Sequence, residues 1–383
     1  MIDHSLRAWA SIDLDALKKN LARVNVHCPE SQIVPVIKAN AYGHGVEQVA
    51  TALQVAHTNC AAFAVATLTE AMQLRTLGIS TPILLLSGFR DRGEMDVCLN
   101  HQFEPVVHSM YQYDLISKHL ETETPAGVGR VWVKFNSGMN RLGLEREQVL
   151  KVYADLDRHP DVEVVLMSHL ASADDLENQA AIDQTKSQVA ELDSLKELLA
   201  ASTQGPVQAS LAASAGILEH GQTHHQFVRP GFMLYGGSPF SNRSAEDLGL
   251  LPVMTLSARI MAINDAEAGA AIGYGGIYRC EKNTRVGIVS IGYADGYPRS
   301  ARNDTPVLVK TKSGTSRTGL LGRVSMDMIA IDLTDIEAAA VGDEVVLWGA
   351  GLAADEIARC ADTIAYELFC KVTNRVKFIY TDE

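Results

Sequence analysis

Over roughly the first 240 residues, short apolar runs alternate with longer segments of helical periodicity, and this alternation restricts the possible folds more than any other feature. Several runs, such as residues 82–86, are apolar throughout, as expected of parallel strands that are covered on both faces. The sequence therefore predicts a series of strand–helix units. The expected strands are residues 33–37, 61–66, 83–87, 103–107, 131–135, 162–168, 207–212 and 228–234.

Helical periodicity falls between these runs, at residues 46–56, 69–77, 111–120, 146–156 and 176–199. Eight strands that alternate with helices close most simply into a (β/α)8 barrel, which takes about 250 residues. A doubly wound open sheet is the alternative, because periodicity does not separate the two. The predicted fold class is α/β, beginning with an N-terminal (β/α)8 TIM-like barrel.

After about residue 240 the pattern changes to strands without intervening helices, so we expect a mainly β C-terminal domain. The run Gly236-Gly237-Ser238-Pro239 and the polar residues after it are typical of a linker. The predicted domains are therefore residues 1–240 and 241–383, and residues 8–13 are a further strand candidate that could join the β domain. Strands in the second domain are expected at residues 254–263, 284–293, 306–310, 328–333 and 344–348.

Charge and composition exclude several classes of partner. The formal net charge of −13 would repel a phosphate backbone, and no basic run offsets it, so nucleic acid is not expected to bind. No segment is long and apolar enough to span a bilayer. Residues 1–8 lack the basic start and apolar stretch of a secretory signal.

The six cysteines are scattered, without a CxxC pair or histidines at zinc-ligand spacing. We therefore expect a reduced, cytoplasmic chain without a metal site. His220, His224 and His225 lie close in sequence, but their setting before a strand favours surface histidines.

Lys38 is the first residue with a chemical implication. It stands where the apolar run 33–37 ends and a flexible polar loop begins, and active sites of barrels lie at this end of the strands. A lysine partly removed from water there would have a lowered pKa and could attack an aldehyde. Spacing alone favours the simpler interpretation, a strand-end lysine that reaches solvent.

The segment around Lys38, VPVIKANAYGHG at residues 34–45, resembles the pyridoxal phosphate (PLP) attachment motif of alanine racemases. The chain resembles that family over essentially its whole length, with further motifs in the expected order. These are KFNSGMNRLG at 134–143, SH at 168–169, RPG at 229–231, LYG at 234–236, IGYADGYPR at 291–299 and GRVSMD at 322–327.

The resemblance implies an alanine racemase that interconverts L- and D-alanine on PLP by a two-base mechanism. Lys38 binds the cofactor as an imine and serves as the base on one face of the substrate, and Tyr293 is the base on the opposite face. A proton must leave one face and return on the other, so two bases are required. Without the motif, Tyr293 would be interpreted as a packed aromatic residue.

The remaining roles also follow from the resemblance. Arg229 faces the pyridine nitrogen, His169 lies near it, and Arg141 donates to the phenolic oxygen and contributes to substrate binding. Lys134 occupies the position of a lysine that the family often carbamylates, and a solvent-facing lysine is equally compatible with the sequence. The phosphate is held by Tyr42, Ser214, Gly231 and Tyr366.

At the same site, Ala213 replaces an asparagine that many family members have before this serine, so one polar cofactor contact is expected to be lost. Met326 and Asp327 match the substrate-carboxylate site. Arg323, Tyr274 and Asp174 are expected at the entrance.

The resemblance further implies a head-to-tail homodimer in which each site uses Lys38 of one chain and Tyr293 of the other. The alternatives are a related barrel decarboxylase, a broad-specificity racemase and a non-catalytic PLP carrier. A decarboxylase would place an acid, not Arg229, at the ring nitrogen, and broad-specificity racemases are commonly exported. A carrier usually lacks a β domain with a second base.

Overall fold

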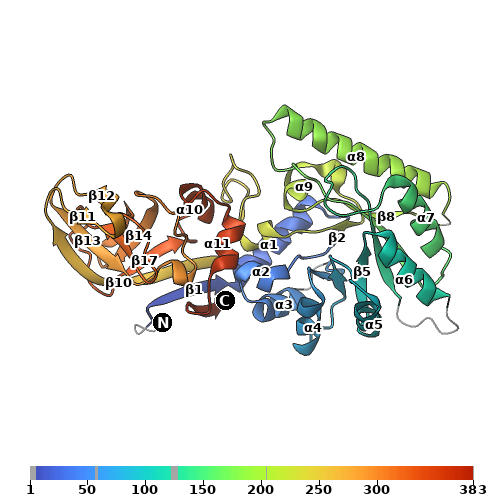
Figure 1. Cartoon of the computed structure of the whole chain (residues 1–383), viewed down its shortest axis with the longest axis horizontal. Coiled ribbons are helices and arrows are strands. Elements are labelled where there is room, and N and C mark those ends of the chain that lie inside the picture. The colour runs from blue at the N-terminus through green and yellow to red at the C-terminus, as the bar shows by residue number, and fades with distance from the viewer. Residues whose placement is uncertain (1–5, 57–58, 122–127, 204, 383) are drawn as a thin grey trace.

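The computed structural model describes residues 6–56, 59–121, 128–203 and 205–382, so the first five residues of the N-terminal run lie outside it. The chain forms two parts side by side, a ring of strands and helices and a mainly β part (Figure 1). Strand and helix assignments agree with an α/β chain that begins with a TIM-like barrel and continues into a mainly β domain. None of the helices in the described ranges is long and apolar enough to cross a membrane.

Eight parallel strands form the barrel, in the order β2-β9-β8-β7-β6-β5-β4-β3. Parallel bridges from Ile33 to Cys60 and from Val36 to Ala64 join the first strand to the last one in this order, so the sheet closes on itself. This closure decides between a barrel and an open sheet. The strands are β2 (Gln32–Ile33), β3 (Phe63–Val65), β4 (Ile83–Leu85), β5 (Phe103–Val107), β6 (Arg130–Lys134), β7 (Glu163–Met167), β8 (Gln208–Ser210) and β9 (Phe227–Val228).

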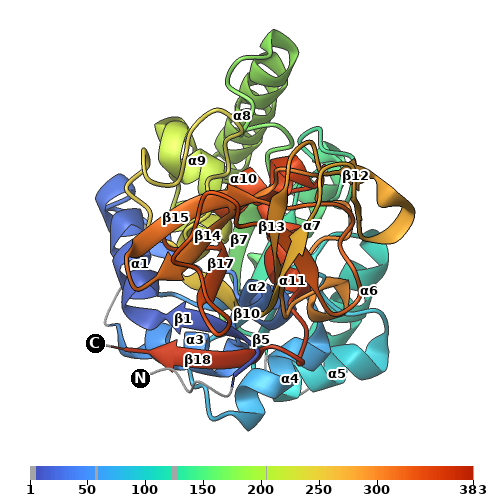
Figure 2. The same ribbon diagram turned by 90° about the vertical axis from the view of Figure 1, so that its left-hand side faces the viewer.

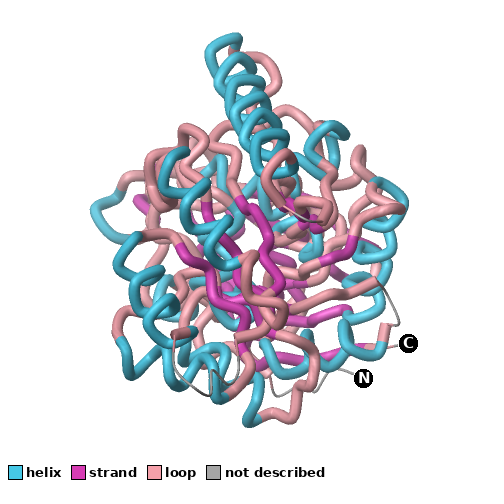
Figure 3. The backbone as a smooth tube through the Cα atoms, turned by 90° about the vertical axis from the view of Figure 1, so that its right-hand side faces the viewer, coloured by secondary structure: helices cyan, strands magenta, loops and turns pink. Residues whose placement is uncertain are grey.

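Helices surround this ring, as the tube in Figure 3 shows. Helix α7, for example, buries Val149, Val152 and Leu156 and packs against β6. The long helix α8 projects from one side of the barrel (Figure 2). The helices of this part are α1 (Leu14–His27), α2 (Lys38–Gly43), α3 (Val46–Val55), α4 (Leu68–Thr76), α5 (Arg92–Asn100), α6 (Met110–Leu120), α7 (Arg146–Leu156), α8 (Gln179–Ala200) and α9 (Ser214–Glu219).

The second part is built on an eight-stranded, mostly antiparallel sheet. The first strand of the chain, β1 (Ala8–Asp13), lies in this sheet, antiparallel to β10 and parallel to β18. The other strands of this sheet are β10 (Met254–Ala266), β13 (Thr284–Val289), β14 (Pro306–Thr311), β15 (Gly314–Gly319), β16 (Ile329–Asp332), β17 (Glu344–Trp348) and β18 (Lys377–Thr381). Strands β11 (Ala271–Ile272) and β12 (Tyr278–Arg279) form a separate two-stranded sheet.

Two helices of the C-terminal part, α10 (Ala354–Cys360) and α11 (Ala365–Lys371), were not expected from the sequence. Each is only seven residues long, too short to show a clear helical period in the sequence. Helix α11 lies beside α2 at the junction of the two parts (Figure 1). The ring of Tyr366 in α11 stacks on Phe232 with 3.6 Å between the centroids. The second part of the chain therefore reaches the end of the barrel.

The expected strand 33–37 is a strand only at β2, with an isolated bridge at Val36. Two other expected strands are also wrong in part. Residues 228–234 form a strand only at β9, and Phe232–Tyr235 is a 3-10 helix. Similarly, the run 284–293 leaves the sheet after Val289, and Tyr293–Asp295 is a 3-10 turn. In both cases a continuous apolar run was interpreted as one strand, although Pro230 and Gly292 interrupt it.

Candidate active site

A cavity of about 670 Å³ opens at the carboxyl ends of the barrel strands. Its lining residues follow β2, β3, β4, β6, β7, β8 and β9, and α11 adds Tyr366 and Cys370. Four cationic side chains line it, Lys38, Lys134, Arg141 and Arg229, against one carboxylate, Asp174. The cavity is therefore suited to an anionic ligand, and its volume lies in the usual range for small-molecule sites.

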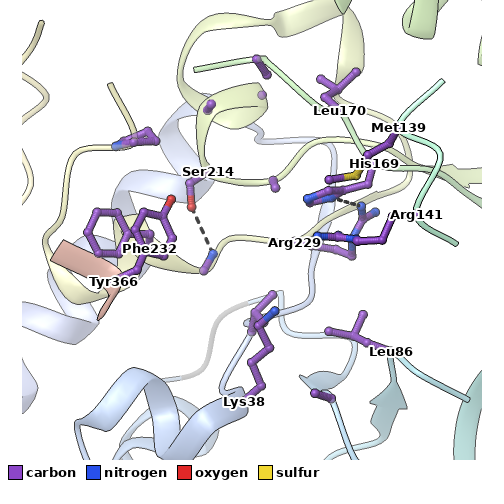
Figure 4. Close-up of a pocket in the computed structure, with 18 of the residues that line it drawn as sticks. Lys38, Leu86, Met139, Arg141, His169, Leu170, Ser214, Arg229, Phe232 and Tyr366 are labelled. Carbon is purple, nitrogen blue, oxygen red and sulfur yellow. Dashed lines mark hydrogen bonds between the residues drawn. The ribbon is translucent and has the colours of Figure 1, made fainter. Parts of the chain in front are cut away.

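Lys38 projects into this cavity from the start of α2, which follows the first barrel strand (Figure 4). Among the described residues its ammonium group makes neither a hydrogen bond nor an ion pair. Burial lowers the pKa of Lys38, the charge of Arg141 lowers it further, and Glu70 acts in the opposite direction. A larger fraction of neutral amine results, which is the form that attacks an aldehyde.

Arg229 lies on the opposite wall and is only 3% exposed. Its guanidinium donates to the hydroxyl of Ser210 and to the carbonyl oxygens of Ser168 (2.6 Å) and Leu211 (3.3 Å). Within the described part of the chain no carboxylate pairs with it. Burial lowers the pKa of Arg229 to about 10, so the group keeps its charge at neutral pH and offers it to the cavity.

His169 is next to Arg229, with 3.5 Å between its Nδ1 and the guanidinium (Figure 4). Burial and then the charge of Arg229 lower the pKa of His169 to about 3, so its ring is neutral near pH 7. The buried Gln188 of α8 fixes this segment, because its amide donates to the carbonyl of His169 (3.0 Å) and accepts from the N–H of Ala171 (2.9 Å).

Lys134 ends β6 and lies among the same cations. Burial and then the charges of Arg229 and Arg141 lower the pKa of Lys134 to about 8. Among the described residues no acceptor bonds its amine, and the burial that lowers its pKa favours a lysine that lies in the cavity over one that faces solvent.

The other end of the cavity is lined by small and aromatic residues. The hydroxyl of Ser214 accepts hydrogen bonds from the backbone N–H groups of Gly231 and Met233, each at 3.2 Å (Figure 4). A Cβ at residue 231 would lie 2.8 Å from the Tyr42 hydroxyl, so only glycine allows this approach. The rings of Tyr42 and Tyr366 lie 6.2 Å apart. Hydroxyls and backbone N–H groups thus converge here, as at phosphate sites.

The structure brings together the residues expected to bind the cofactor, but Tyr293, Met326 and Asp327 are not among the residues that line the cavity. These three lie on two paired turns of the C-terminal part. The N–H groups of Tyr293 and Ala294 donate to the carbonyls of Ser325 and Met326, at 3.0 Å each. Tyr293 is 38% exposed and Met326 is 52% exposed.

A buried carboxylate that sequence reasoning left without a role supports these turns. The side chain of Asp295 is fully buried, pairs with Arg7 and with Arg375 (3.3 Å), and accepts from the N–H of Gly292 (2.9 Å). Arg375 also pairs with Asp327 at 2.6 Å. The sequence contains one indication of this burial: the neighbours of Asp295 in GYADG, residues 292–296, are all uncharged.

Of the expected entrance residues, Asp174 lines the cavity, whereas Arg323 and Tyr274 do not. Ser210 and Glu70 were missed. Ser210 gives no sequence signal, but Thr67-Leu68-Thr69-Glu70 has the pattern of a capping box, which the structure contains. That pattern would also have placed the start of α4 correctly.

The fold and the cavity define a barrel enzyme with a lysine amine and a hydroxyl-lined, cationic surface in one pocket. The chain belongs to the alanine racemase family. Residues 12–239 match the model of the alanine racemase N-terminal domain, and residues 253–380 match that of the C-terminal domain.

Individual relatives agree over the full length. The alanine racemase of Vibrio parahaemolyticus is 43% identical over 377 residues, which are 98% of this chain and 99% of the relative. The biosynthetic alanine racemase of Pseudomonas aeruginosa has a similar structure, with a TM-score of 0.88 and 40% identity over 98% of this chain and 100% of the other. The alanine racemase of Bartonella henselae was solved with covalently bound pyridoxal phosphate, and it superposes with a TM-score of 0.84 at 27% identity over 98% of this chain and 99% of the other.

Proposed function

We propose that this chain acts as an alanine racemase that carries PLP on Lys38. It is an isomerase of the PLP-dependent family and interconverts L-alanine and D-alanine. The observation that carries the residue assignments is the cationic cavity around Lys38, because one pocket presents a reactive amine, a hydroxyl-lined anion site and two arginines.

The residues present fit the cofactor. Lys38 would bind its aldehyde, and Tyr42, Ser214, Gly231 and Tyr366 would hold its phosphate. Arg141 would donate to the phenolic oxygen, since a guanidinium suits an anionic oxygen. Arg229 would face the ring nitrogen with His169 beside it, and a guanidinium that keeps its charge near pH 7 does not supply a proton readily. When bound, PLP withdraws electrons from the substrate Cα–H bond and makes that proton acidic.

Two residues of the protein then move the proton. The Nζ of Lys38 removes or returns it on one face of the substrate Cα, and the phenolic oxygen of Tyr293 does so on the other. Arg141 and the backbone N–H groups at Met326 and Asp327 would bind the substrate carboxylate. If the proton returned to the same face of Cα that it left, the starting enantiomer would form again. Racemisation therefore needs one residue on each face.

The position of Tyr293 outside the cavity of its own chain supports a homodimer with shared sites. In a two-fold, head-to-tail pair, the exposed turns with Tyr293 and Met326 of one chain would close the cavity of the other. The separated monomer is then expected to be nearly inactive. Activity per chain that stays constant on dilution to demonstrated monomers would contradict this arrangement.

We propose that the neutral amine of Lys134 reacts with CO2: a bond forms between Nζ and the carbon, one proton leaves the nitrogen for water, and the resulting carbamate pairs with Arg141. Carbamate formation needs a neutral amine, and the lowered pKa of Lys134, about 8, supplies it near neutral pH. The anion would also offset part of the positive charge that crowds the cavity.

A cytoplasmic location is proposed from the cysteines, which are free among the described residues, three of them fully buried. The biological role would be to supply D-alanine for peptidoglycan or to use D-alanine as a nutrient, since both roles use one reaction.

The test follows PLP-loaded protein with L-alanine in D2O, measuring D-alanine by chiral chromatography and deuterium at Cα by mass spectrometry. Deuterated D-alanine is expected. Neither exchange nor D-alanine, with PLP shown on Lys38, would favour a cofactor carrier, and release of CO2 would favour a decarboxylase.

A further inference from the structure

The segment directly after Lys38 has a backbone conformation that L-amino acids rarely adopt. Helix α2 is a left-handed turn in which Ala39, Asn40, Ala41 and Tyr42 have φ of 52°, 55°, 54° and 52°. Non-glycine residues visit this region one at a time, because their Cβ approaches the following carbonyl oxygen. Four in succession persist only where surrounding contacts fix them.

This turn places two residues of the proposed cofactor site. Residues four apart on a helical turn lie on the same side of it, and Lys38 and Tyr42 both line the cavity. A change in the turn would therefore move the amine and the phosphate-side hydroxyl together.

The far end of the turn is held by residues from its own neighbourhood. His44 is fully buried, and its Nδ1–H donates to the carbonyls of Ala41 (3.1 Å) and Tyr42 (2.9 Å). The side chain of Asn40 accepts from the N–H of Val46 at 2.8 Å, which connects the turn to α3.

The near end, which follows Lys38 at once, is held from a different strand–helix unit. One carboxylate oxygen of Glu70, in α4, accepts a hydrogen bond from the N–H of Ala39 at 2.7 Å. The other oxygen accepts from the N–H groups of Ala66 (2.8 Å) and Thr67 (3.0 Å), where β3 ends. Glu70 therefore joins the left-handed turn to the neighbouring strand.

We propose that Glu70 is a positioning residue for Lys38: its carboxylate fixes the start of the left-handed turn and so aims the lysine amine at the cofactor aldehyde. The proposal rests on the proposed function, in which Lys38 carries the cofactor. Glu70 is absent from the residues that line the cavity, so it acts through the turn.

Charge gives a second, separable effect. The groups that act on the Lys38 amine are Arg141, which lowers its pKa, and Glu70 and Cys370, which raise it. A neutral residue at position 70 should therefore shift the titration of Lys38 to lower pH. Displacement of the Lys38 amine should instead slow its reaction with the aldehyde even at a pH where the amine is fully neutral.

Glu70→Gln separates positioning from helix capping. Glutamine has one acceptor oxygen, and in a capping box it serves the N-cap N–H, here Thr67. The Ala39 N–H then loses its acceptor. Thr67→Ala is the matched control, because it removes the hydroxyl that accepts from the Glu70 N–H (3.3 Å) and leaves the bond to Ala39 intact.

The experiment removes the cofactor, adds PLP to the apoprotein, and follows imine formation by absorbance across a range of pH. At the high-pH plateau we expect Glu70→Gln to react roughly ten- to a hundredfold more slowly than the unmodified protein, the penalty typical of a misplaced reacting group. Thr67→Ala is expected to stay within about twofold of it, since a lost cap acts on helix stability. The midpoint for Glu70→Gln should also fall to lower pH.

Equal plateau rates for Glu70→Gln and Thr67→Ala would overturn the proposal. Failure of the unmodified apoprotein to form an imine would instead refute the proposed function. If Glu70→Gln does not fold, hydrogen exchange of the Ala39 amide in the unmodified protein tests the proposal. The hydrogen bond to Glu70 predicts that this amide is protected. Exchange at the rate of an unstructured peptide would refute the bond.

Discussion

Replacement of Asp295 by asparagine should destabilise the C-terminal part and displace Tyr293. The side chain of Asp295 is fully buried and faces two guanidiniums, Arg7 and Arg375. Asparagine keeps its shape but loses the charge and one acceptor oxygen. Both arginines are more than a third exposed and can turn to water, so we expect a loss of about 3 kcal/mol, the lower end for a broken buried ion pair.

Asp327→Asn is the control, since Asp327 shares Arg375 but its side chain is 50% exposed. An exposed pair contributes at most about 1 kcal/mol. Urea unfolding of both variants measures the difference, and Asp295→Asn should also lower turnover while leaving the Lys38 imine absorbance unchanged. Equal losses of stability in the two variants would refute the reasoning.

Three further results are expected. Arg229→Glu should raise transamination, seen as pyruvate formed from L-alanine, because a carboxylate would hold a proton on the ring nitrogen; unchanged pyruvate would refute the role of Arg229. Removal of CO2 should lower activity, and added bicarbonate should restore it. Mass spectrometry should detect the added mass of a carbamate on the Lys134 peptide in the active sample only. Burial lowers the pKa of His225 to about 4, below the value near 6.5 of an unfolded chain, so its contribution to stability is present above pH 6.5 and lost as the pH falls toward 4. His225→Gln should remove about 2 kcal/mol of the stability lost between pH 7.5 and pH 5, measured by urea unfolding.

The barrel and the family were predictable because the evidence for both is local. A strand buried on both faces, such as residues 83–85, is apolar in every position, and short motifs keep their order along the chain. The prediction of an α/β barrel followed by a β domain and of the alanine racemase family is confirmed.

Features that depend on distant partners were not predictable. The left-handed turn after Lys38 is held by Glu70, which lies thirty-one positions after Ala39. Within ANAY only the asparagine is a residue type that commonly adopts positive φ, and then singly, so the sequence does not indicate four such residues in succession. Likewise, Asp295 looks like a loop aspartate until Arg7 and Arg375 are seen beside it. The roles of Lys38 and Tyr293 remain predictions.

The most direct test of the shared site mixes two inactive variants, Lys38→Ala and Tyr293→Phe, under conditions that exchange subunits. In a mixed dimer one site would combine both substitutions and the other would have an intact Lys38 and an intact Tyr293. Random pairing should therefore restore about a quarter of the activity of the unmodified protein. A mixture that forms mixed dimers yet stays as inactive as its parents would contradict the account.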